Sequence, residues 1–188
     1  MITQSYDTTD TEQSSDVAAI RDAIRDIPDF PKPGIVFKDI TTVLRDPALL
    51  KKTVDYFYHR LKSQNIAYVV GIESRGFIFG APLAYQLNAG FVPIRKKGKL
   101  PGPVARQSYT LEYGEDVIEI HDDAIPAGAR VVLIDDLLAT GGTAAAACEL
   151  LKQIQVEVVA IEFLIHLTFL NGQEKLPATC PMHAMIHY

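Results

Sequence analysis

The sequence has few of the features that would assign a chain to a membrane, a nucleic acid or an extracellular compartment. Its 188 residues include only two cysteines, Cys148 and Cys180, which are too few for a disulfide framework. No apolar run approaches the length of a membrane span, and the first residues lack a secretory signal. The net charge of −5 argues against general binding of nucleic acid. We therefore expect a cytoplasmic protein with no nucleic-acid or membrane partner.

Common metal and nucleotide motifs are also missing. His183 and His187 are four residues apart, but Met185 and Ile186 beside them favour a strand that separates the two rings. We therefore expect no metal held by protein ligands alone. No lysine follows the Gly141-Gly142 pair, and no Gly-x-Gly-x-x-Gly motif opens a dinucleotide domain.

The composition is that of an ordinary globular protein, with 48% hydrophobic and 22% charged residues. A chain of this length can bury a single core. Residues 1–15 are polar, with too little apolar surface to order themselves, and are expected to form a flexible N-terminal extension. The prediction is a single domain over residues 16–188.

Strands and helices are expected to alternate along most of this domain. Apolar spacing predicts helices from Asp16 to Pro28, after Asp46-Pro47, over residues 76–87 and after Gly142. Short β-branched runs predict strands at residues 68–72, 91–94, 131–134 and 156–165. Alternating residues at 108–113 and 117–121 predict an inserted β-hairpin with its turn at residues 114–116. The expected class is α/β, with parallel β-α-β units under right-handed crossovers.

The most informative stretch runs from Val131 to Thr143. A buried strand leads into a turn composed of small and hydroxyl residues, namely Ala139, Thr140, Gly141, Gly142 and Thr143. The alanine-rich segment that follows predicts a helix, so the turn lies at a helix N-terminus. Backbone N–H groups and the helix dipole favour a phosphate there, and glycine permits close approach of the backbone. The alternative is a tight turn with incidental acidic neighbours.

Two carboxylates, Asp135 and Asp136, fall at the carboxyl end of the same strand. Ligands of open α/β sheets bind at that edge. Adjacent carboxylates can accept hydrogen bonds from a pair of neighbouring sugar hydroxyls. The pattern therefore predicts a sugar-phosphate site.

A second strand-to-helix junction carries Arg75, whose guanidinium suits bidentate contact with phosphate. Four cations then occur within residues 95–99, here called the cationic segment. They are followed by glycine and proline, which is the composition of a mobile lid over an anionic leaving group. The alternative interpretation of Arg75 is a surface arginine in a turn, and the cationic segment by itself would be interpreted as solvated surface charge.

Several motifs together resemble the type I phosphoribosyltransferases, and more narrowly their adenine-specific members. The resemblance covers nearly the whole chain from about Ile27. It includes residues 28–31, 33–34, 37–40, 74–77, 111–114 and 135–143. It implies an open, mainly parallel twisted sheet with helices on both faces, an inserted β-hairpin and a small N-terminal hood.

The resemblance also implies roles for individual residues. The turn Ala139–Thr143 matches the 5′-phosphate loop, and Asp135 and Asp136 match the ribose-binding pair. The residues that match pyrophosphate contacts are Arg75, Arg95, Lys99 and Tyr113. Those that match the adenine site are Val36, Phe37, Lys38 and Leu137, with Phe37 and Leu137 stacking on the two faces of the purine. An ordinary core phenylalanine is the competing interpretation of Phe37.

Glu112 is the acid/base candidate. Alternation in the expected hairpin places it with Ser108 and Thr110, away from the aromatic face. A surface glutamate is the alternative. The resemblance assigns it to the proton on the purine imidazole.

The expected reaction is transfer of ribose 5-phosphate from 5-phospho-α-D-ribose 1-diphosphate to adenine, giving AMP and pyrophosphate in purine salvage. Mg²⁺ is expected to bind through the substrate pyrophosphate, and the resemblance implies a homodimer. The alternatives are a related transferase for a 6-oxopurine or orotate, and a non-catalytic regulator that senses phosphoribosyl pyrophosphate. All of them require the turns near Arg75 and Gly141 to open onto one crevice.

Overall fold

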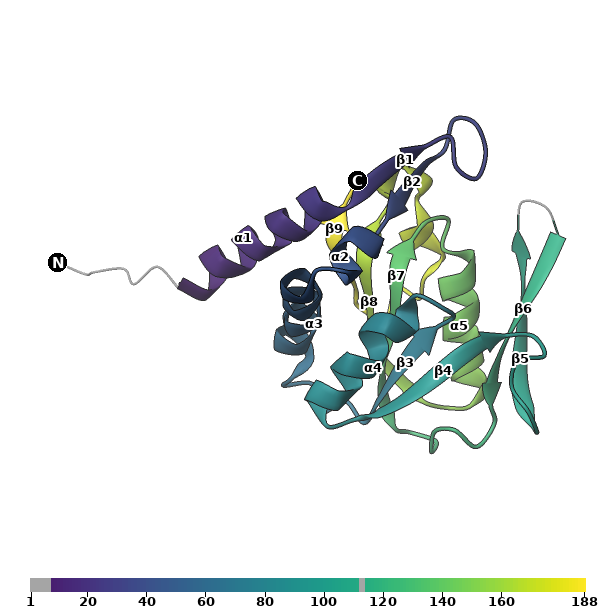
Figure 1. Cartoon of the computed structure of the whole chain (residues 1–188). Coiled ribbons are helices and arrows are strands. Elements are labelled where there is room, and N and C mark those ends of the chain that lie inside the picture. The colour runs from purple at the N-terminus through teal and green to yellow at the C-terminus, as the bar shows by residue number, and fades with distance from the viewer. Residues whose placement is uncertain (1–7, 112–113) are drawn as a thin grey trace. The chain divides into compact units, whose positions relative to one another are not determined.

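The computed structural model describes residues 8–111 and 114–188 (Figure 1). The described chain forms two compact units, one ending at Tyr56 and one beginning at Phe57. The division falls inside helix α3 (Pro47–Leu61). As the sequence predicts, Pro47 opens this helix and Asp46 caps it, with Asp46 Oδ1 accepting from the Ala48 and Leu49 amides at 2.8 and 3.1 Å.

The first unit contains α1 (Thr8–Ala23), β1 (Arg25–Pro28), β2 (Val36–Asp39), α2 (Thr41–Leu44) and the start of α3. The helix expected from Asp16 to Pro28 is therefore displaced: it already covers residues 8–15 and ends at Ala23. Residues 25–28 form an antiparallel hairpin with β2 instead, and Arg25 Nε donates to Asp39 Oδ2 at 3.0 Å. The pairing with β2 overrides the helical spacing of the isoleucines in this segment.

The second unit is built on a seven-stranded sheet in the order β5-β6-β4-β3-β7-β8-β9. The strands are β3 (Tyr68–Ile72), β4 (Gly90–Lys96), β5 (Val104–Leu111), β6 (Gly114–His121), β7 (Arg130–Leu138), β8 (Glu157–His166) and β9 (Met182–His187). Five adjacent strands, β4, β3, β7, β8 and β9, are parallel to one another. Strand β6 pairs antiparallel with both β4 and β5. The helical elements are α4 (Gly76–Leu87), α5 (Gly142–Gln153) and the 3₁₀ turns η1 (Thr168–Leu170) and η2 (Gly172–Lys175). The expected α/β class is confirmed.

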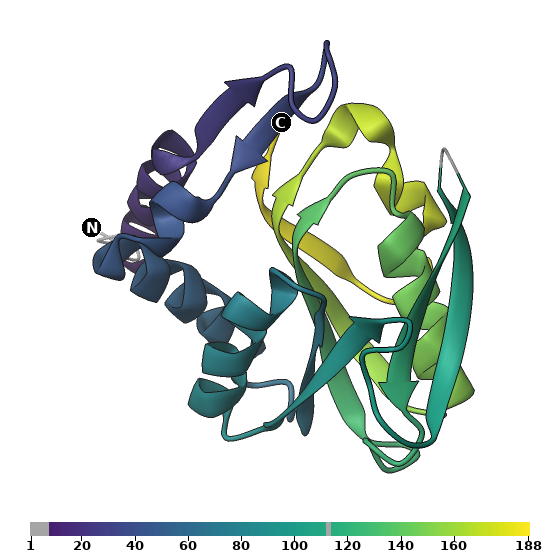
Figure 2. The ribbon, with the colours of Figure 1, turned by 45° about the vertical axis from the view of Figure 1, so that its right-hand side comes forward.

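The sheet is covered on opposite faces by α4 and α5 (Figures 1 and 2). Buried strand residues such as Val70, Leu133 and Phe163 share one apolar cluster with α5. On the other face, Gly80 of α4 lies so close to the strands that an added Cβ would be 2.8 Å from the Phe91 ring. Because alternate residues of each strand are buried under different helices, the strands are apolar almost throughout.

The inserted hairpin is confirmed, but its register differs from the prediction. Leu111 pairs with Gly114, and Tyr109 pairs with Asp116, so residues 114–116 belong to β6 and do not form the turn. The hairpin joins β4 and curves around α5 (Figure 2), where Gln153 Nε2 donates to Gln107 Oε1 at 2.7 Å. Within the part of the chain that the structure describes, no helix combines the length and apolarity needed to span a membrane.

Candidate functional site

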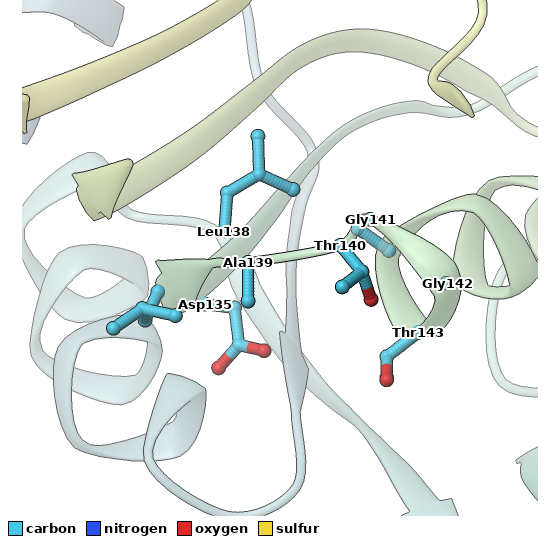
Figure 3. Close-up of a pocket in the computed structure, with 9 residues that line it drawn as sticks. Asp135, Leu138, Ala139, Thr140, Gly141, Gly142 and Thr143 are labelled. Carbon is cyan, nitrogen blue, oxygen red and sulfur yellow. The ribbon is translucent and has the colours of Figure 1, made fainter. Parts of the chain in front are cut away.

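The turn between β7 and α5 lines a pocket at the carboxyl edge of the sheet (Figure 3). Its lining residues are Asp135, Leu137, Leu138, Ala139, Thr140, Gly141, Gly142, Thr143 and Ala144. The hydroxyls of Thr140 and Thr143 and the carboxylate of Asp135 point to the same side of the turn. The first turn of α5 adds backbone N–H groups without intrahelical partners. The pocket therefore offers donors for an anion next to acceptors for hydroxyl groups.

Glycine is required at two places beside this turn. Gly141 has φ +77°, a left-handed conformation that favours glycine, and an added Cβ would be 2.2 Å from the Gly172 carbonyl oxygen. A Cβ on Gly172 would in turn be 2.1 Å from the Ala139 carbonyl oxygen. The turn therefore rests directly on the backbone of η2, which fixes its shape.

The two carboxylates belong to the last part of β7, which runs on through Leu138. Asp135 is half-buried, and its Oδ1 accepts from the Asp136 amide at 2.9 Å. Asp136 is buried, and Arg75 Nε lies 3.0 Å from its Oδ2. Burial and the charge of Asp136 raise the pKa of Asp135. Burial also raises the pKa of Asp136, although Arg75 opposes this effect. The folded protein therefore disfavours the ionised form of both carboxyl groups.

The second strand-to-helix junction, between β3 and α4, meets the first at the sheet edge. The strands β3 and β7 are parallel neighbours, so their carboxyl ends lie side by side. Gly76 approaches so closely that an added Cβ would be 2.6 Å from the Ile134 carbonyl oxygen and 3.1 Å from Asp135 Oδ1. Together with the pair between Arg75 and Asp136, this contact places the two junctions next to each other at the sheet edge, while the residues that line the pocket lie between Asp135 and Ala144.

The cationic segment is held by carboxylates on two sides. Glu73 accepts from Arg95 Nε at 3.1 Å, from the Lys96 amide at 2.9 Å and from Lys99 Nζ. On the other side, the buried Glu119 accepts from the Gly98 amide at 2.9 Å and from Arg106 Nε at 2.7 Å. The segment predicted as a mobile lid therefore makes hydrogen bonds to both carboxylates in this structure.

The residues predicted for the base are placed in different units. Val36, Phe37 and Lys38 lie in strand β2 of the first unit, and not in a loop, whereas Leu137 lies in β7 of the second unit. Val36 is exposed, and the Phe37 ring meets the Phe30 ring edge-on at 5.3 Å. Lys38 Nζ donates to Asp26 Oδ1 across the hairpin at 2.7 Å. Glu112 and Tyr113 lie outside the described residues.

Sequence reasoning missed Glu73, Glu119 and Gly172. Glu73 directly follows a buried strand, the same signal that identified Asp135 and Asp136, and could have been found in this way. Gly172 follows Asn171, which is a turn signal, but its contact with Gly141 depends on how distant segments pack. Among residues 8–111 and 114–188, no group of three or more His, Cys, Asp or Glu is arranged to hold a metal ion.

The chain is similar in sequence and in structure to known proteins. Residues 39–178 match the phosphoribosyl transferase domain. The chain is 59% identical over 169 residues to the adenine phosphoribosyltransferase of Acaryochloris marina, covering 90% of this chain and 99% of that protein. The adenine phosphoribosyltransferase structure from Rhodothermus marinus superposes with a TM-score of 0.88 at 51% identity, covering 93% and 99% of the two chains. The Saccharomyces cerevisiae enzyme, complexed with adenine and an imino-altritol bisphosphate, has a TM-score of 0.88 at 43% identity, covering 92% and 99%.

Proposed function

The chain belongs to the phosphoribosyl transferase family, and from this membership we propose how its residues transfer ribose 5-phosphate to adenine. The reaction is that of a glycosyltransferase of purine salvage and yields AMP and pyrophosphate. The observation that carries the assignment of roles is the meeting of two anion-binding turns, near Arg75 and Gly141, around the pair Asp135 and Asp136. A sugar phosphorylated at both ends is the ligand that such an arrangement fits.

The turn Ala139–Thr143 binds the 5′-phosphate of the donor. The N-terminus of α5 supplies backbone donors and the positive end of the helix dipole. The hydroxyls of Thr140 and Thr143 add further donors on the same side. Because Gly172 supports the turn from behind, its donors are fixed before the phosphate arrives.

Asp135 and Asp136 bind the ribose hydroxyls and face the positive charge that develops on the sugar. The bond from the anomeric carbon to the pyrophosphate oxygen breaks, and a bond from that carbon to a purine nitrogen forms. Positive charge builds on the ribose ring while the first bond lengthens. Burial disfavours the ionised form of both carboxyls, and the charge of Asp136 adds to this effect at Asp135. The positive charge on the sugar stabilises the ionised forms, so the interaction is stronger in the transition state than in the ground state.

Arg75, Arg95, Lys99 and Tyr113 bind the pyrophosphate and stabilise the negative charge that it gains on leaving. Mg²⁺ prefers phosphate oxygens and water to an all-protein cage, so it would be held through the pyrophosphate of the donor. When bound, it neutralises part of the charge on the leaving group. Closing the site around these groups excludes water, which would otherwise hydrolyse the donor.

For the base, we propose the residues that the family resemblance assigns to adenine. Phe37 and Leu137 contact the two faces of adenine, while backbone groups of Val36 and Lys38 read its edge. Glu112 takes the proton that the imidazole ring of adenine loses when the new bond forms.

An assay of pyrophosphate release tests this assignment. With the donor and Mg²⁺, we expect turnover with adenine well above that with hypoxanthine, guanine or orotate, and none after chelation of Mg²⁺ with EDTA. Glu112→Ala should lose about 10²- to 10⁴-fold in kcat, the usual contribution of a general base. Preference for hypoxanthine, guanine or orotate would contradict the choice of base. Tight donor binding without turnover would indicate a sensor in place of an enzyme.

We also propose a homodimer. Helix α4 presents Ile78 and Tyr85 seven residues apart on one face, 39% and 88% exposed. Burying such a face against a second copy would remove apolar surface from water. Light scattering should give about twice the chain mass of 20.7 kDa. A mass equal to that of one chain at assay concentrations would rule the dimer out.

A cytoplasmic location is proposed on the basis of the two thiols. Cys148 and Cys180 are both free in the structure, as suits a reducing compartment. Burial raises the pKa of Cys148 to about 12, which keeps it protonated and unreactive. Recovery of the native protein in a secreted fraction would contradict this location.

A further inference from the structure

Glu73 is the third acidic residue at the carboxyl edge of the sheet, and the roles proposed above leave it without one. It directly follows β3, two residues before Arg75. Its side chain is only 10% exposed. A buried carboxylate beside an anion-binding site would repel the anion unless cations neutralise its charge.

The charge of Glu73 is neutralised by cations of the cationic segment. Its Oε2 accepts from Arg95 Nε at 3.1 Å and from the Lys96 amide at 2.9 Å, and its Oε1 accepts from Lys99 Nζ. Although burial opposes the effect, these hydrogen bonds lower the pKa of Glu73 to about 2. The carboxylate is therefore ionised at any pH at which the protein is assayed. Arg95 and Lys99, which were assigned to pyrophosphate on separate grounds, both contact this one side chain.

The backbone of Glu73 is itself fixed. Its amide donates to the Ile94 carbonyl oxygen at 2.9 Å, which continues the pairing of β3 with β4. Two residues later, the Arg75 guanidinium pairs with Asp136. The carboxylate is thus attached to the rigid sheet edge, and the two flexible cations are attached to the carboxylate.

The contacts with Glu73 leave donors for a second anion. The bond from Arg95 uses Nε, and a guanidinium carries four more N–H donors on its terminal nitrogens. The carbon of the same guanidinium lies 5.9 Å from the centre of the Phe77 ring, which also restricts its orientation. Lys99 uses one of three ammonium donors. Both cations can therefore keep their contact with Glu73 while they bind pyrophosphate.

We propose that Glu73 is a positioning residue for the pyrophosphate site. It orders Arg95 and Lys99 before pyrophosphate binds and acts on the ligand through them, without touching it. The inference rests on the proposed function, because it takes pyrophosphate as the ligand of these two cations. Each rotamer-rich side chain that is ordered in advance saves part of the cost of binding, and for two such side chains the saving corresponds to about tenfold in affinity.

Calorimetric titration with inorganic pyrophosphate and Mg²⁺ tests the proposal. Glu73→Gln removes the charge but keeps the size of the side chain, and it should raise the Kd of pyrophosphate about tenfold. Glu157→Gln is the control, because Glu157 pairs with Arg130 at the opposite end of the sheet and should leave the affinity unchanged. If Glu73→Gln has an unchanged or lower Kd, the glutamate competes with pyrophosphate or is irrelevant to it, and the proposal is wrong.

A double-mutant cycle separates positioning from general support of the fold. In the background Arg95→Met with Lys99→Met, the change Glu73→Gln should leave the Kd of pyrophosphate unchanged or lower it, because the two cations that Glu73 orders are gone and only its repulsion of the anion remains. The same tenfold loss in that background would refute the proposal. Glu73→Asp is the second variant in case the glutamine form does not fold. It keeps the charge on a side chain one methylene shorter, and should fall between the parent and the tenfold loss.

The two proposals fail in different ways. A parent protein that binds pyrophosphate but does not use adenine would refute the proposed function and leave Glu73 as a positioning residue. A parent that turns over adenine, with a Glu73→Gln variant of unchanged pyrophosphate affinity, would refute only the role of Glu73.

Discussion

Asp136→Asn is expected to lower kcat/KM for the phosphoribosyl donor by about 10²- to 10³-fold, as for the loss of one preorganised electrostatic contact in a buried site. The substitution keeps the shape of the side chain but removes the charge that we propose to face the sugar. It also removes the charge that Arg75 Nε approaches at 3.0 Å. The measurement is steady-state kinetics of pyrophosphate release with adenine. Asp123→Asn, an exposed residue in the turn after β6, is the matched control and should keep the activity of the parent.

The same variant should lose less stability than the parent as the pH rises. Burial raises the pKa of Asp136 above 3.8, and burial with the charge of Asp136 raises that of Asp135. A carboxyl whose pKa is raised by folding makes the protein most stable below pH 3.8 and less stable as the pH rises through the folded-state pKa. Asp136→Asn removes part of this loss, so its thermal midpoint should decrease less than that of the parent as the pH rises.

Retention of more than about a third of the activity, measured as kcat/KM, would contradict the role of Asp136.

Gly141→Ala is expected to damage both stability and phosphate binding. The alanine would sit at φ +77°, and its Cβ would be 2.2 Å from the Gly172 carbonyl oxygen. Because that contact is with backbone, the turn itself must move, and its donors move with it. We expect a loss of roughly 2 to 4 kcal/mol in the free energy of unfolding. Since the turn binds the 5′-phosphate in our proposal, affinity for AMP should drop at least about tenfold, which is about 1.4 kcal/mol.

Gly128→Ala is a closely matched control for this experiment. Gly128 has the same φ of +77°, but an added Cβ meets nothing within 4 Å. It therefore tests the backbone conformation without the clash. That conformation costs about 1 to 2 kcal/mol. AMP affinity should remain that of the parent. Denaturant unfolding and AMP titration of both variants give the comparison. If Gly141→Ala behaves like Gly128→Ala in both measurements, the close approach of Gly172 does not shape the turn.

Elements whose signals are local could be predicted with correct bounds. Strand β3 and helix α4 occur at residues 68–72 and 76–87, as their apolar spacing predicts. The helix start at Asp46-Pro47 is correct for the same reason, since a cap acts over three residues. The errors fall in two hairpins, where pairing between strands competes with the preference of a single segment. Arg25–Pro28 leaves the predicted helix to pair with β2, and Gly114 pairs with Leu111 where a turn was predicted.

The site divides in the same way. The phosphate turn and the two carboxylates were predictable because strand, acids, turn and helix follow one another without interruption over residues 131–143, so each group reaches the sheet edge through its own backbone. The sequence by itself determined this chemistry and the α/β class. Only the tertiary structure decided that Gly172 supports Gly141, that Arg75 meets Asp136 and that Glu73 holds Lys99, which is 26 residues away. These contacts depend on the order of strands in the sheet, which arises from the packing of all segments together and has no local signal in the chain.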